Sequence, residues 1–144
     1  MMDYANELIE YWIDTLLATH KSVKVVICEG NHDEILSAAT RKLYRRMYGR
    51  IYKSNRVEFI DSEMPYYAYQ FSDNVSFGWH HGHESKMDSL PMKMISMFPE
   101  IFTGAKYSYL DTGHFHHKKK LSVDVVDNGS FEVTQLRSIT AKSD

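Results

Sequence analysis

The feature that most constrains the fold is the stretch of residues 29–34, which comes directly after the apolar run of residues 23–28. That run is short and rich in β-branched residues, which indicates a buried strand, and Gly30 would end it in a tight turn. A helical pattern begins at Glu34. The order strand, glycine turn, helix is typical of the front of an α/β unit.

Three polar residues occupy the turn between this strand and this helix. Asn31 and His32 are predicted at the C-terminal end of the strand, where open α/β sheets place their ligands. The amide oxygen of Asn31 can ligate a cation without adding charge, and the His32 imidazole can donate a proton to a phosphate oxygen. Asp33 is placed to cap the helix and to orient His32.

Two later stretches combine histidines with a glycine at the end of an apolar run, residues 79–83 (Trp-His-His-Gly-His) and residues 113–117 (Gly-His-Phe-His-His). In chain order, GNHD, HGH and GHFH resemble the last three motifs of the calcineurin-like metallophosphoesterases. The resemblance spans Val23 to about Lys120. The family's two earlier motifs, DxH and GDxxD, have no counterpart before Val23, so we expect the chain to be a fragment of a larger metallophosphoesterase domain.

The resemblance implies a two-metal site and assigns its ligands. Asn31, His81 and His114 would bind one divalent cation, and His116 would bind the other. The implied metals are Mn, Fe, Zn or Ni, with only one or none bound in this chain, because half of the ligands are missing. Such sites clamp a phosphate between two cations about 3.5–4 Å apart.

The same resemblance assigns catalytic roles. His32 would act as general acid beside the leaving group, with Asp33 orienting it. Apart from the resemblance, His83 is a candidate for substrate contact. Alternation along the chain places His80 opposite His81, and His117 opposite His116, which indicates structural or solvent-facing roles for His80 and His117.

Composition bounds the remaining possibilities. A chain of 144 residues with 43% hydrophobic residues supports a single domain, residues 1–144. The net charge of −2 gives no overall bias toward nucleic acid or membrane, and Cys28 is the only cysteine. Without a basic leader or an apolar run near 20 residues, a soluble, cytoplasmic domain is expected.

The periodicity of the chain predicts an α/β fold, a partial layered α/β sandwich without its first strands. Predicted helices span residues 4–19, 33–48 and 89–98, with Gly49 just past the end of the second. Predicted strands span residues 23–28, 57–60, 66–71, 75–79, 107–111, 121–126 and 131–136. Hairpin turns are expected at residues 72–74 and 127–129.

The sequence supports two functional hypotheses from different classes and a third that assumes a different fold. The first is a metal-dependent phosphoesterase acting on a phosphomonoester or phosphodiester, nucleic acid included, although this chain alone is expected to be inactive. The second is a non-catalytic metal-binding or interaction module derived from that fold. The third is a single-metal histidine site on a cupin-like barrel, which the predicted helices disfavour. An unpaired sheet edge also predicts a homo-oligomer.

Overall fold

The computed structural model describes residues 2–32, 34–51, 55–115 and 117–137. The chain folds into two compact units. The first unit combines residues 1–27 with 38–60, and the second combines residues 28–37 with 61–144. None of the helices in the described ranges is both long and apolar enough to cross a membrane.

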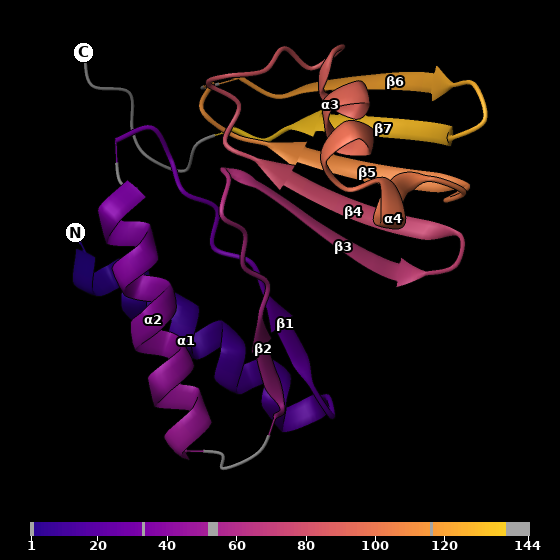
Figure 1. Cartoon of the computed structure of the whole chain (residues 1–144). Helices are drawn as coiled ribbons and strands as arrows, with labels where there is room; N and C mark the ends of the chain where they lie inside the picture. Colours follow the sequence, from indigo (N-terminus) through magenta and orange to yellow (C-terminus); the bar gives the residue numbers. More distant parts are fainter. Residues whose placement is uncertain (1, 33, 52–54, 116, 138–144) are drawn as a thin grey trace. The chain divides into compact units, whose positions relative to one another are not determined.

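The first unit contains two long helices and a small parallel sheet (Figure 1). Its elements are α1 (Met2–Thr19), β1 (Val23–Val25), most of α2 (Glu34–Ile51) and β2 (Val57–Phe59). Strands β1 and β2 pair in parallel. The predicted elements are therefore present, but the first strand is shorter than predicted. It ends at Val25, so Cys28 lies beyond it. Gly49 lies inside α2 rather than past its end.

The buried side of α2 is not the one that the spacing of its aliphatic residues favours. Ile35 and Leu43 are 88% and 53% exposed. Tyr44 and Tyr48 are buried instead. Burial raises the pKa of the Tyr44 hydroxyl, with Glu10 adding to the shift. The core of this unit consists of Ile13, Leu17, Val23, Tyr44, Tyr48 and Phe59.

Several arginines of the basic stretch 41–56 donate hydrogen bonds to backbone carbonyls. Arg41 is buried and donates from Nη1 to the Ile27 carbonyl at 2.8 Å. Arg56 donates from Nη2 to the Leu17 carbonyl at 2.6 Å. Because the last carbonyls of a helix lack intrahelical donors, the Arg56 guanidinium stabilises the C-terminus of α1.

The second unit is built on a five-stranded sheet with the order β3-β4-β5-β7-β6. Its strands are β3 (Tyr66–Ser72), β4 (Val75–His80), β5 (Tyr107–Thr112), β6 (Lys119–Val125) and β7 (Gly129–Gln135). The pairs β4–β5 and β5–β7 are parallel, whereas β3–β4 and β6–β7 are antiparallel hairpins. Both predicted hairpins are confirmed, and the α/β class with them.

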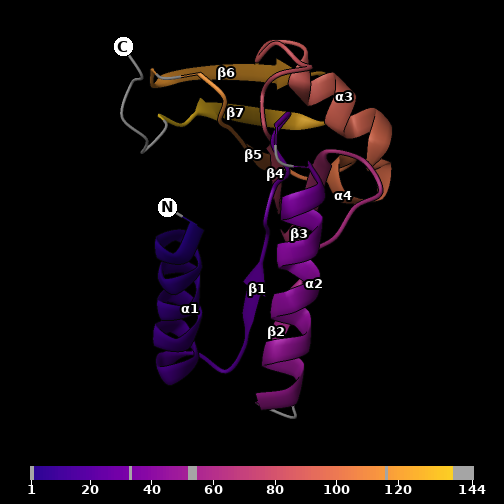
Figure 2. The same cartoon turned by 90° about the vertical axis from the view of Figure 1, so that its left-hand side faces the viewer.

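Two short helices connect β4 to β5 and cover one face of this sheet (Figures 1 and 2). They are α3 (Leu90–Met97) and α4 (Pro99–Phe102). The sequence predicted the first of these, but it did not predict α4. The core between helices and sheet consists of Tyr66, Leu90, Met94, Phe102, Leu110, Phe131 and Val133.

The opposite face of the sheet carries the half-buried carboxyl of Asp111, whose register partners are Trp79 and Thr134. Burial raises the pKa of the Asp111 carboxyl, and the nearby Glu132 raises it further. A folded-state pKa above the unfolded value of about 3.9 means that the native state holds the proton more tightly. Ionisation of Asp111 therefore destabilises the fold as pH rises through the raised pKa.

Replacing Asp111 with asparagine should remove this cost. The melting temperature at pH 7 should rise, and the gain should be smaller at pH 4, which is closer to the raised pKa of the native carboxyl. Thermal melts at both pH values measure the effect, with Asp124→Asn on exposed β6 as the control. A gain of equal size at both pH values would show that ionisation of Asp111 is not its origin.

Candidate metal centre

Asn31 reaches the site from an irregular segment rather than directly from a strand. Because β1 ends at Val25, residues 26–30 separate the strand from Asn31, which corrects the expected position at a strand end. The half-buried Asn31 amide faces two histidines. Its Oδ1 lies 3.1 Å from His81 Nε2, and its Nδ2 lies 3.1 Å from His32 Nε2.

His81 and His114 follow two neighbouring parallel strands. Strand β4 ends at His80 and β5 ends at Thr112, so their carboxyl ends share one edge of the sheet. The Gly113 N–H donates to the His81 carbonyl at 2.9 Å and ties the two loops together. His114 Nδ1 consequently lies 3.2 Å from His81 Nε2.

The backbone at these two loops is unusual. Gly82 has a φ of 109°, and a Cβ atom there would lie 3.0 Å from the Gly113 carbonyl oxygen. His114 has a φ of 66°, in the left-handed region that non-glycine residues seldom adopt. Strained residues of this kind cluster at functional sites, where the surrounding structure holds them in place.

His80, the last residue of β4, lies under the loop that carries His81 and is 1% exposed. Its Nδ1 accepts a hydrogen bond from the Gly82 N–H at 3.0 Å, and its ring stacks on Tyr66 with centroids 4.2 Å apart. Burial, together with the neighbouring His83, His81 and Lys93, lowers the pKa of His80 to about 4. The ring is thus neutral at pH 7 and acts as a structural support.

His83 lies beside the other histidines, with its ring centroid 5.5 Å from that of His81. Its Nε2 contacts Glu84 at 3.4 Å, while its buried Nδ1 has no hydrogen-bond partner among the described residues. His32 is exposed at the edge of the cluster. The remaining two predicted site residues, Asp33 and His116, lie outside the described residues.

The donor atoms of Asn31 and His114 each lie at a distance from His81 Nε2 that a shared cation would allow. Ligand atoms bonded to a metal at about 2.1 Å lie about 3.0–3.4 Å apart for angles of 90–109°. The observed separations of 3.1 and 3.2 Å fall within this range. A proton on His81 Nε2 can form a good hydrogen bond to only one of Asn31 Oδ1 and His114 Nδ1. A cation could accept a lone pair from each of the three atoms.

The cluster contains one amide and two imidazoles, with no carboxylate. Within the part of the chain that the structure describes, no group of three or more His, Cys, Asp or Glu side chains is arranged to hold a metal. The donor set therefore fits a single ion held partly by an amide. It lacks the anionic bridge that two adjacent cations need.

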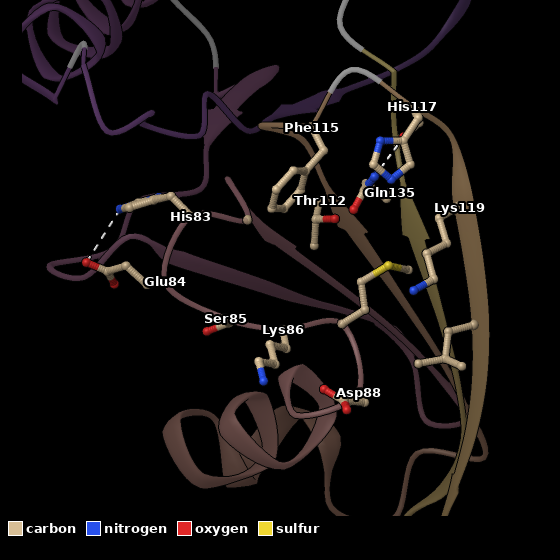
Figure 3. A pocket seen from close by; sticks show the side chains of 13 residues that line it. His83, Glu84, Ser85, Lys86, Asp88, Thr112, Phe115, His117, Lys119 and Gln135 are labelled. Carbon is tan, nitrogen blue, oxygen red and sulfur yellow. Dashed lines mark hydrogen bonds and ion pairs between the residues drawn. The ribbon is translucent and has the colours of Figure 1, made fainter.

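A cavity of about 710 Å³ lies next to this cluster in the second unit (Figure 3). It is lined by Gly82, His83, Glu84, Ser85, Lys86, Met87, Asp88, Thr112, Phe115, His117, Lys119, Leu121 and Gln135. Phe115, Thr112, Gln135 and Lys119 gather on one side, and Ser85, Lys86 and Asp88 lie on the other. The Phe115 ring is 4.9 Å from that of His114, which places the cavity beside the cluster of Asn31, His81 and His114.

Sequence reasoning missed the floor of this cavity. Thr112 on β5 is in register with Gln135 on β7, which is in register with Lys119 on β6. Residues two apart in a strand point to the same face, so Lys119 shares a face with Leu121, whereas Lys120 does not. This spacing could have placed Lys119 on the helix-covered face of the sheet. The neighbouring Lys120 instead pairs with Glu132 at 2.6 Å.

Comparison with known proteins gives no relative for this chain. No protein-family model matches it, and neither the curated proteins nor the solved structures include a significant match.

Proposed function

We propose that this chain carries half of the site of a calcineurin-like metallophosphoesterase, with one divalent cation held by Asn31, His81 and His114. The observation that supports the proposal most strongly is that Asn31 Oδ1 and His114 Nδ1 lie 3.1 and 3.2 Å from His81 Nε2. The strained backbone of His114 also supports it, since it brings Nδ1 to the shared position. A bound cation would supply Lewis-acid polarisation of a phosphate ester.

The residues around this position have separate roles in the proposed reaction. The Asn31 amide orients two rings, since Oδ1 faces His81 and Nδ2 faces His32. Because Asn31 Nδ2 donates to His32 Nε2, the neutral His32 ring carries its proton on Nδ1. His32 is exposed and would be the proton donor to the leaving group.

We expect this chain alone to bind one metal and to hydrolyse phosphate esters barely or not at all. A second cation would bring the charge in the cleft to +4, and the described cluster offers no carboxylate to offset the repulsion. Under this proposal, efficient turnover requires the DxH and GDxxD ligands of the family. The sheet in such a domain would be part of a layered α/β sandwich.

Elemental analysis of chain purified without chelator tests the proposal. We expect about one transition metal per chain in the unmodified protein and none in His114→Ala. His20→Ala, which removes an exposed histidine after α1, should keep the metal. An unmodified chain that stays metal-free in excess Mn²⁺ and Zn²⁺ would refute the proposal.

Hydrolysis of an activated aryl phosphodiester in excess Mn²⁺ separates the proposed enzyme fragment from a complete catalyst. No turnover above the rate with buffer and metal is expected for this chain. Robust turnover that is lost in both His32→Ala and His81→Ala would contradict the expected inactivity and show that the chain supplies all the ligands it needs.

A further inference from the structure

The cavity beside the metal ligands has the size of a ligand site. Its volume of about 710 Å³ lies within the range of small-molecule pockets, about 300–1,000 Å³, and far exceeds what a phosphate ion needs. Its lining begins at Gly82 and Phe115, which directly follow the proposed ligands His81 and His114. A phosphate ester centred on those ligands would place its organic group in this cavity.

The wall of the cavity combines an aromatic ring with aliphatic side chains. Phe115 is 45% exposed, so its ring is accessible to a ligand. Met87 and Leu121 are half-buried and pack against the core of the second unit, which makes their positions well defined. Flat aromatic surfaces of this kind stack on nucleobases, at about 1–3 kcal/mol per base.

The floor of the cavity provides fixed hydrogen-bonding groups. Thr112 and Gln135 are each 4% exposed, and they are register partners on adjacent parallel strands. Gln135 Nε2 donates to the His117 carbonyl at 2.7 Å, which fixes the amide plane. The second Gln135 N–H and its Oε1 remain a donor and an acceptor that can pair with the polar edge of a base.

Charges of both signs border the cavity. Lys119 extends from the end of β6 beside Gln135, and Lys86 and Asp88 lie on the opposite side (Figure 3). Glu84 contacts His83 at 3.4 Å. A ligand that carries an anionic group together with hydrogen-bond donors suits this arrangement. A nucleotide has both, because its phosphate can bind a lysine and the amino group of its base can donate to a carboxylate.

We propose that this cavity binds a nucleotide, and that the substrate class of the site is therefore a phosphodiester with a nucleoside beside the reacting phosphate. The second part rests on the proposed phosphoesterase function, whereas nucleotide binding itself does not require the metal. Phe115 stacks on the base, Gln135 and Thr112 pair with its polar edge, and Lys119 binds a phosphate oxygen.

Calorimetric titration with 5′-AMP, in buffer with EDTA, tests the binding. The unmodified chain should bind 5′-AMP at least about tenfold more tightly than inorganic phosphate or glycerol phosphate, which lack the base. Lys119→Gln should weaken 5′-AMP binding by about tenfold, and Lys119→Arg should restore most of it. Phe115→Leu should remove the preference for 5′-AMP over glycerol phosphate.

Lys120→Gln is the matched control, because Lys120 is the adjacent lysine and faces away from the cavity toward Glu132. Its affinity should stay within about twofold of the unmodified chain. Equal binding of 5′-AMP and inorganic phosphate, or equal losses in Lys119→Gln and Lys120→Gln, would overturn the proposal. Thermal melts confirm that each variant folds.

Parallel metal analysis keeps this proposal separate from the proposed function. Nucleotide binding in EDTA, combined with a chain that stays metal-free in excess Mn²⁺ and Zn²⁺, would support the cavity assignment and refute the metal site. Metal bound by Asn31, His81 and His114 without any preference for 5′-AMP would refute the cavity assignment alone.

Discussion

Replacing His81 with alanine should lower the affinity of this chain for divalent metal by more than about 100-fold. His81 Nε2 is the central donor of the cluster, 3.1 Å from Asn31 Oδ1 and 3.2 Å from His114 Nδ1. Loss of a hydrogen-bond partner behind a metal ligand typically costs 10–100-fold in affinity, and loss of the ligand itself should cost more. Competition titration with a chromophoric chelator measures the effect.

The fold must survive the substitution for this result to be informative. His81 is half-buried, and the 2.9 Å hydrogen bond from the Gly113 N–H to its backbone carbonyl does not involve the imidazole. We therefore expect the melting temperature of metal-free His81→Ala to stay close to that of the metal-free parent. A variant that folds and retains its metal affinity would exclude His81 as a ligand. His20→Ala controls for the general loss of an imidazole.

The fold was predictable where the signal was local. The hairpins depend on short turn sequences, and Asp127 and Gly129 adopt the positive φ values of 65° and 73° that such turns require. The buried side of α2 was not predictable from apolar spacing. Tyr44 and Arg41 bury long side chains whose polar ends find backbone carbonyls, of Asn6 and Ile27 respectively.

The candidate site was likewise predictable only in part. The resemblance of GNHD, HGH and GHFH to the motifs of one family predicted that Asn31, His81 and His114 share a site. The parallel pairing of β4 and β5 aligns the strand ends that precede His81 and His114. The cavity floor depends on the register of three strands. Register is a long-range property, so the convergence of Gln135 and Lys119 was not visible in the chain order.

Gly129→Ala should destabilise the second unit by about 3 kcal/mol or more, the largest stability effect that we expect from a single methyl group. A Cβ atom at this position would lie 2.5 Å from the carbonyl oxygens of Ala105 and Lys106. Both contacts are with backbone, so no side chain can rotate away. The Lys106 carbonyl also accepts the Ser130 N–H at 3.1 Å, and that hydrogen bond would be strained as well.

Two other glycines separate steric overlap from the cost of backbone conformation. Gly104 also has a positive φ, 86°, but a Cβ atom there would meet nothing within 4 Å, so Gly104→Ala should cost only about 1–2 kcal/mol. Gly49 lies inside α2 with open space around it, and Gly49→Ala should stabilise the fold by about 0.5–1 kcal/mol. Urea unfolding of all three variants measures the order. If Gly129→Ala costs no more than Gly104→Ala, the hairpin turn does not pack against residues 105–106.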